Sequence, residues 1–493
     1  MRSAAPLLAL TALLAACSDS PSRPAADAGT TTDAGTPADA GPLDSGVEPD
    51  AGTPAPRGVL QFKLQHNLAT DACLAAQDCA LTIEAAPAEL DRWLQSLADA
   101  STQAVLHYDR AIPWAAFEVD APQGEDPVAF YDARIDADLR GYLDAFVTHF
   151  ARFEHRYLAV SPLGGVRDRP AALRKPDGTE VNTPEACASF TATTATDFGG
   201  RSIQVAPAYQ RFVTYLAKKL HPTDLGIMVE ANLFHRFCPA AWPSLVTLYH
   251  QLYTALRAEL GPDVRLFATL TLLDLLGFDG DTCHALGFTP CGQTPPTPAT
   301  PDPAVCFPLD RGALDDLDRD DHLDLLALSF YPDGLGMQPP GVPEQRITAL
   351  PEDSDGTGAC IADALMPPLI DPFDALAGLG WTKPVAIAEW SARSCSTLQW
   401  WVAPDTTAVV RFDASPEGQA WWMTRILALA DEGKLAFINH SFLWDYAPIG
   451  TWMPQRGALD PNIYNLFNNW PCSGLYDEHG VEKPQVAPLW LGR

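Results

Sequence analysis

The chain has 493 residues, of which 47% are hydrophobic and 19% are charged, so it is long and apolar enough to bury a sizeable core. Lysine and arginine number 32 against 62 aspartate and glutamate, which gives a formal net charge of −30. This acidity argues against nucleic-acid binding, which requires a basic surface to neutralise phosphates. It also disfavours electrostatic attachment to anionic lipid.

Residues 1–17 form the first predicted segment, an export signal. They contain one arginine, an apolar stretch too short to span a membrane as a mature helix, and small residues before Cys17. The run Leu14-Ala15-Ala16-Cys17 resembles a bacterial lipobox, a signal in which the cysteine is lipidated and becomes the mature N-terminus. The resemblance implies a protein of the cell envelope that is lipid-anchored to a membrane or the cell surface. The alternative is an ordinary cleaved signal in which Cys17 has no role.

Residues 18–56 form the second predicted segment, a disordered linker. Asp-Ala-Gly occurs four times in it, at Asp27, Asp33, Asp39 and Asp50, and it has no aromatic residue. Such a composition cannot bury enough apolar surface to offset the entropy of ordering the chain. We therefore expect an extended tether that leads to one catalytic domain over residues 57–493.

Ten cysteines follow Cys17, and an even number in an exported chain predicts up to five disulfides. The connectivity stays open, although Cys73 with Cys79 and Cys283 with Cys291 are close enough in sequence to form small clips. Nothing predicts a metal or a cofactor, because no CxxC motif occurs. The acidic run that begins at Asp316 lacks the glycine and the glutamate that a calcium loop has at its sixth and twelfth positions.

Eight short apolar runs alternate with helical segments after the linker. The continuous hydrophobicity of runs such as 325–328 is typical of strands buried on both faces, as in a parallel sheet. Eight β/α units predict a (β/α)₈ TIM barrel, with a Cys-rich insertion over residues 278–317 on a loop after the fifth strand. The predicted strands are Val59–Leu64, Gln103–His107, Tyr157–Ser161, Leu225–Glu230, Arg265–Thr271, Leu323–Phe330, Pro384–Glu389 and Ala436–Leu443.

The fourth and seventh predicted strands each end in a glutamate, Glu230 and Glu389. A carboxylate beside an apolar run is costly to bury unless it is paired or hydrogen-bonded, so these residues are candidates for function. Two carboxylates at one barrel mouth can flank a glycosidic bond. One then protonates the leaving oxygen and the other attacks the anomeric carbon. Retention of configuration predicts a separation of about 5–5.5 Å between the two carboxyls.

This arrangement resembles clan A of the glycoside hydrolases, in which the acid/base follows strand four and the nucleophile follows strand seven. The resemblance implies that Glu230 is the acid/base and that Glu389 is the nucleophile. The sixth strand ends Ser329-Phe330-Tyr331-Pro332, which resembles a segment of the endo-β-1,4-galactanases of that clan. Tyr331 would then hydrogen-bond the nucleophile. Trp444, at the end of the eighth strand, corresponds to a tryptophan that commonly serves as a sugar platform.

Further substrate-binding candidates lie beside these strand ends: His107 and Arg110 after the second strand, Asn232 after Glu230, and Trp390 after Glu389. The clan usually has an asparagine immediately before the acid/base, where it binds the sugar 2-hydroxyl. Val229 holds that position here. Either Asn232 or another side chain replaces the usual residue, or the chain belongs to an outlying family, or catalysis has been lost.

The sequence thus predicts an exported, lipid-anchored, retaining glycoside hydrolase that acts on a polysaccharide or oligosaccharide. We expect a monomer whose partner is its carbohydrate substrate and which meets the membrane through its anchor alone. The competing hypothesis is a surface carbohydrate-binding lipoprotein on a degenerate, non-catalytic barrel. Val229 in place of asparagine is the feature that favours this alternative.

Overall fold

The computed structural model describes residues 54–60, 87–183, 185–277, 288–290, 309–332, 347–349, 359–361, 372–403, 406–412, 414–445, 470 and 472–492. Within these residues parallel strands alternate with helices, so the fold is mixed α/β. The predicted export signal, nearly all of the linker, the two proposed cysteine clips and most of the predicted Cys-rich insertion lie outside the described residues. Among the helices that are described, none combines the length and the apolarity needed to cross a bilayer.

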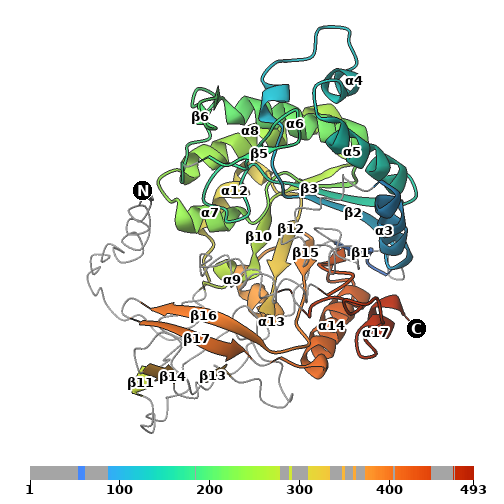
Figure 1. Ribbon diagram of the computed structural model, residues 1–493, viewed down its shortest axis with the longest axis vertical. Coiled ribbons are helices and arrows are strands. Elements are labelled where there is room, and N and C mark those ends of the chain that lie inside the picture. The colour runs from blue at the N-terminus through green and yellow to red at the C-terminus, as the bar shows by residue number, and fades with distance from the viewer. Residues whose placement is uncertain are drawn as a thin grey trace, which may run out of the picture.

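The centre of the structure consists of two parallel sheets, ordered β1-β18-β15-β12-β10 and β2-β3-β8-β9 (Figure 1). Every one of the eight predicted runs overlaps a strand of these sheets, and the fifth run contains both β9 and β10. The strands are β1 (Arg57–Val59), β2 (Gln103–Tyr108), β3 (His155–Val160), β8 (Asp224–Gly226), β9 (Arg265–Phe267), β10 (Thr269–Thr271), β12 (Leu326–Phe330), β15 (Val385–Trp390) and β18 (Ile438–His440).

Helices pack around these sheets and complete the β/α alternation (Figure 1). Local signals account for where two of them begin: the Asp136 side chain accepts a hydrogen bond from Leu139 N at the start of α5, and Ser415 accepts one from Gly418 N at the start of α14. The helices are α3 (Pro87–Asp99), α4 (Pro127–Asp132), α5 (Ala137–Phe150), α6 (Val205–Leu220), α7 (Ala231–Phe237), α8 (Trp242–Leu260), α9 (Leu272–Leu275), α12 (Gly312–Leu317), α13 (Pro372–Leu376), α14 (Pro416–Asp431) and α17 (Ala487–Leu491).

Short antiparallel elements are inserted after several strands. Those that follow β12 and β15 lie at the end of the structure opposite to the helices α5, α6 and α8 (Figure 1). The antiparallel sheets are β4-β5, β6-β7, β11-β14 and β13-β17-β16. Their strands are β4 (Leu173–Arg174), β5 (Glu180–Val181), β6 (Thr196–Asp197), β7 (Ser202–Ile203), β11 (Phe288–Pro290), β13 (Ile347–Ala349), β14 (Ala359–Ile361), β16 (Thr397–Ala403) and β17 (Thr406–Phe412). Three 3₁₀ turns complete the described elements: η2 (Trp114–Phe117), η3 (Arg319–Asp321) and η5 (Ala377–Leu379).

The two sheets adjoin at two places. β9 and β10 are consecutive pieces of one chain segment that break at Ala268, so this segment pairs with β8 on one side and with β12 on the other. At the other junction, between β1 and β2, Thr102 N donates to Arg57 O at 2.7 Å, but the described residues there form no parallel ladder. The strands therefore follow one another in the order of the predicted barrel. The described residues form no continuous hydrogen-bonded ladder that closes it.

The junction of β1, β2 and β18 depends on Gly58. Gln103 of β2 donates a 2.5 Å hydrogen bond to Asn439 of β18, and both side chains are buried. A Cβ atom at Gly58 would overlap Val105 and Asn439. Glycine therefore lets β1 lie between its two neighbours, where a larger residue would force the strands apart.

Gly58→Ala should lower the free energy of unfolding by about 1–3 kcal/mol, because the added methyl group overpacks this junction. The matched control is Gly141→Ala. Gly141 is exposed in the middle of α5, and a Cβ there would meet nothing within 4 Å. Alanine at that position should stabilise the protein by about 0.5–1 kcal/mol, since it is the better helix former. Urea denaturation of both variants measures the difference, and equal stabilities would show that the junction tolerates a side chain.

Two disulfides are present in the described part of the chain, Cys187–Cys238 and Cys395–Cys472. The first links the long connection between β3 and α6 to the residue that follows α7. The second links the segment after β15 to the segment before α17. Each disulfide therefore lies on a connection that follows a strand end predicted to carry function.

Candidate active site

Glu230 lies at the junction between the end of the β8 segment and α7. Its backbone has φ 49° and ψ 45°, the left-handed conformation, and it forms the N-cap of the helix. The Glu230 N–H donates to the Thr269 hydroxyl at 2.8 Å, and Thr269 N donates to Met228 O at 2.9 Å. These bonds hold the turn against β10. A left-handed residue that is not glycine costs free energy, and such residues cluster at functional sites.

Glu389 lies within β15, next to an irregularity in the sheet. Leu328 is paired with Ile387 while the next residue, Ser329, is paired with Glu389, so β15 contains one extra residue against β12. The pairing of β15 with β18 also shifts in register, between Ile387 and Trp390. Bulges of this kind turn a side chain away from the regular alternation of the strand. Glu389 is only 6% exposed.

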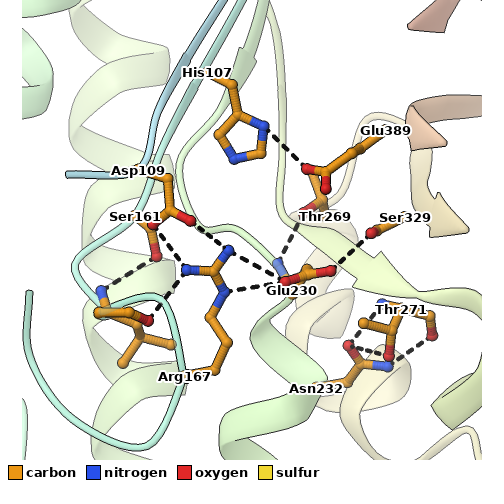
Figure 2. Close-up of polar contacts among 12 residues, drawn as sticks. His107, Asp109, Ser161, Arg167, Glu230, Asn232, Thr269, Thr271, Ser329 and Glu389 are labelled. Atoms are coloured by element: carbon orange, nitrogen blue, oxygen red, sulfur yellow. Dashed lines mark hydrogen bonds and ion pairs between the residues drawn. The ribbon is translucent and has the colours of Figure 1, made fainter. Parts of the chain in front are cut away.

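The carboxyls of Glu230 and Glu389 converge on one space at the carboxyl ends of the parallel strands (Figure 2). Ser329 connects them, because its hydroxyl donates to Glu230 Oε1 at 2.7 Å while its backbone is in register with Glu389. Burial raises the pKa of the Glu230 carboxyl, and the negative charge of Glu389 raises it further. The positive charge of Arg167 and the hydrogen bond from Ser329 oppose this rise without cancelling it.

Glu389 contacts two polar side chains. His107 Nδ1 lies 3.1 Å from Glu389 Oε2, which is an ion pair when the imidazole is protonated. The Tyr331 hydroxyl donates to Glu389 Oε1 and also lies 2.8 Å from Ser441 Oγ. Because the tyrosine has a single proton, Ser441 is the donor in the second bond. Burial raises the pKa of Tyr331 well above its usual value, so Tyr331 stays a donor.

The structure adds an ion pair that the sequence pattern did not reveal. Arg167, from the loop after β3, contacts Glu230 Oε2 with Nε at 3.2 Å and with Nη2 at 3.1 Å. Its Nη1 and Nη2 also donate to the two oxygens of Asp109, at 2.8 Å and 2.7 Å (Figure 2). The available signals were an arginine beside Gly164-Gly165 after the third strand and an aspartate between the candidates His107 and Arg110. Neither showed that the two would meet.

The other predicted binding residues lie in different surroundings. Asn232 exchanges hydrogen bonds with the backbone of Thr271, at 3.0 Å and 2.8 Å, and so fastens α7 to β10 instead of presenting its amide to a ligand. Trp390 has no exposed surface and packs edge-on against His440, with 4.9 Å between ring centroids. As the residue after Glu389 on β15, it points away from the space that Glu389 enters, and its role in substrate binding stays a prediction.

Arg110 and Trp444 complete the predicted set. The Arg110 guanidinium lies over the ring of Tyr142 on α5, 4.7 Å from its centroid, and so is directed to the helix and not to the two carboxyls. Trp444 is 7% exposed and forms a bridge with Tyr476 at the end of the β18 segment. Of the residues proposed from the sequence, His107, Glu230, Tyr331 and Glu389 are therefore the ones that the structure brings together.

No cluster of three or more histidine, cysteine, aspartate or glutamate side chains in the described ranges is arranged to hold a metal ion.

No protein-family model matches the chain, and no curated protein is similar to it in sequence. Solved structures of similar shape include an endo-laminarinase from Formosa Hel1_33_131, at 13% identity and a TM-score of 0.37 over 79% of this chain and 86% of that one. An exo-β-1,4-mannosidase from Opitutaceae bacterium strain TAV5 has 15% identity and a TM-score of 0.45, over 92% of this chain and 61% of that one. A β-glucuronidase from Bacteroides uniformis has 11% identity and a TM-score of 0.42, over 88% of this chain and 34% of that one. All three likenesses are remote, and we infer the function below from the site alone.

The raised pKa of Glu230 predicts a pH-dependent stability. Folding favours the protonated carboxyl, and this contribution is complete below the unfolded-state pKa of glutamate, about 4.3, and is lost as the pH rises through the raised pKa of the folded protein. Glu230→Gln should remove that loss. The free energy of unfolding of the variant minus that of the wild type should increase from about pH 4 to about pH 8. Urea denaturation across this range measures it, and a difference that stays constant would contradict the prediction.

Proposed function

We propose that this protein is a retaining glycoside hydrolase in which Glu230 is the acid/base and Glu389 is the nucleophile. The observation that carries the proposal is the convergence of two carboxyls with opposite surroundings, of which Glu389 is buried and Glu230 is 15% exposed. Removal from water favours the protonated form of Glu230, whereas Glu389 accepts a hydrogen bond from Tyr331 and lies beside His107. An acid and a nucleophile need this difference in environment.

In the proposed first step, the Glu389 carboxylate attacks the anomeric carbon while Glu230 gives its proton to the leaving oxygen. The hydrogen bond from Tyr331 at Oε1 and the contact with His107 at Oε2 fix the direction in which Glu389 attacks. In the second step the oxygen of a water molecule attacks the anomeric carbon while Glu230, now ionised, takes its proton. The bond to Glu389 breaks, the sugar leaves, and both carboxyls return to their starting states.

The competing function, binding of carbohydrate without catalysis, is favoured by two observations. Val229 is fully buried at the position where clan A of the glycoside hydrolases has its sugar-binding asparagine. Asn232 does not replace that asparagine, because its amide binds the backbone of Thr271. Arg167 also forms an ion pair with the proposed acid. Activity measurements decide between these functions, because a binding protein would release no reducing ends from any glycan.

The experiment begins with a screen of the soluble domain against plant and microbial glycans, with release of reducing ends as the readout. Glu389→Ala should abolish turnover on the substrate found, and azide or formate should restore it with inverted product. Glu230→Ala should lower kcat by about 10²–10⁴-fold on the same substrate and by much less on an aryl glycoside whose leaving group needs no proton. Glu259→Ala, which removes a surface glutamate paired with Lys218, is the matched control and should keep full activity. If Glu389→Ala stays active without azide, the assignment of the nucleophile is wrong.

We also propose that the protein is anchored in the cell envelope through a lipid on Cys17, because the preceding Leu14-Ala15-Ala16 completes a lipobox-like run. Cys17→Ser should release the protein from the membrane fraction or block its maturation. Fractionation of cells grown with a labelled fatty acid measures both effects. A serine variant that stays with membranes, together with an unlabelled wild type, would rule the anchor out.

A further inference from the structure

The guanidinium of Arg167 makes more polar contacts than it would need only to close a loop. It is 3% exposed, and its guanidinium contacts both oxygens of Asp109, one oxygen of Glu230 and the carbonyl of Gly164 at 3.1 Å. The contact with Asp109 is bidentate and short, whereas the contacts with Glu230 are longer and reach a single oxygen. Asp109 is therefore the principal counter-charge of Arg167, and Glu230 is the secondary one.

The backbone around this ion pair is held in unfavourable conformations. Arg167, Cys187 and Glu230 all have positive φ, at 61°, 54° and 49°. The Cys187 N–H donates to Asp168 O at 2.6 Å, and its disulfide to Cys238 joins this loop to the end of α7, the helix that begins at Glu230. Arg167 and Glu230 are thus connected through their side chains at one end of α7 and through the disulfide at the other. Strain persists where surrounding structure over-determines it, so this arrangement fixes the Arg167–Glu230 contact.

An unshielded arginine beside Glu230 would hold that carboxyl ionised at neutral pH, and an ionised group cannot donate the proton that the first step needs. Asp109 changes this balance, since its carboxylate binds the Nη1–Nη2 edge of the guanidinium, next to the Nε–Nη2 edge that faces Glu230, and neutralises its charge (Figure 2). We propose that Asp109 and Arg167 form a positioning pair for Glu230: Arg167 fixes the direction of the carboxyl, and Asp109 neutralises Arg167 so that Glu230 keeps its proton. The role of that proton in catalysis rests on the proposed function, whereas the charge balance itself does not.

The surroundings of the three charged groups are consistent with this role. Burial raises the pKa of Asp109, but the neighbouring Arg167 guanidinium lowers it by more, so Asp109 remains an anion. Burial, Glu389 and Asp109 raise the pKa of Glu230 against the opposing effect of Arg167. Among the described residues, the titratable and charged groups that face this assembly from the elements packed against it are His107 of β2, Tyr157 of β3, Tyr209 of α6, Tyr331 after β12 and Glu389 of β15.

The test compares two variants that should shift the titration of Glu230 in opposite directions. Asp109→Asn leaves the charge of Arg167 directed at Glu230 alone, so the titration of Glu230 should move to lower pH by about one unit or more. Arg167→Met by itself would leave Asp109 buried without a partner, so the second variant is the double substitution Asp109→Asn with Arg167→Met. It removes both charges together and should move the titration to higher pH than in the wild type, because Arg167 lowers the pKa of Glu230 by more than Asp109 raises it.

Infrared titration of the protonated carboxyl, assigned by its disappearance in Glu230→Gln, measures these shifts without any need for activity. The basic limb of the kcat/KM profile should move in the same directions on a substrate that is turned over. Asp136→Asn is the matched control, because it disrupts a comparable buried bidentate pair with Arg174, at 2.7 Å and 2.8 Å, that has no contact with Glu230. It should leave the Glu230 titration in place.

A Glu230 titration that stays unchanged in Asp109→Asn, or that moves in the same direction in both variants, would overturn the proposal, because loosened structure shifts both variants alike. If the titration moves as expected but no glycan is hydrolysed by the wild type, the charge balance is supported and the proposed hydrolase function fails. The two failures are thereby distinguishable.

Discussion

The placement of two carboxyls beside one another, both largely removed from water, is the constraint that shapes this site. Glu230 and Glu389 repel each other when both are ionised, and each loses hydration in the folded state. A buried charge requires a partner, and here the partners differ: a guanidinium and a serine for Glu230, an imidazole and a phenol for Glu389. Because their partners differ, Glu230 and Glu389 have different chemical surroundings.

The partners come from distant parts of the chain, so the site exists only when the parallel strands are assembled. His107 lies on β2, Arg167 on the loop after β3, Ser329 on β12 and Ser441 directly after β18. Each of these side chains sits where a strand ends, which is where parallel α/β folds collect their functional groups. The bulge of β15 and the left-handed turn at Glu230 are local departures from regular structure that aim the carboxyls into this space.

The Cys187–Cys238 disulfide ties the Arg167 loop to α7, while Cys395–Cys472 ties the segment after Glu389 to the C-terminal part of the chain. Near the second disulfide, Lys483 donates to Cys472 O at 2.7 Å and pairs with the buried Asp445 at 2.7 Å. Burial raises the pKa of Asp445 to about 7. Covalent and ionic links thus hold the connections that follow both glutamates, where a loose loop would let the carboxyls drift apart.

The sequence by itself determined the eight strand segments, because hydrophobic runs act over a few neighbours. It also determined that Glu230 and Glu389 stand at strand ends, whereas the contact of Tyr331 with Glu389 was implied by the resemblance to the endo-β-1,4-galactanases. Only the tertiary structure decided the pairing of Arg167 with Asp109. Their separation of 58 residues is closed by a loop whose course depends on the disulfide and on left-handed turns, neither of which leaves a periodic signal. It also decided the direction of Asn232, through the contact of α7 with the Thr271 backbone, and that of Trp390, through the register of β15 with its neighbours. Neither depends on the distance in sequence from a functional residue.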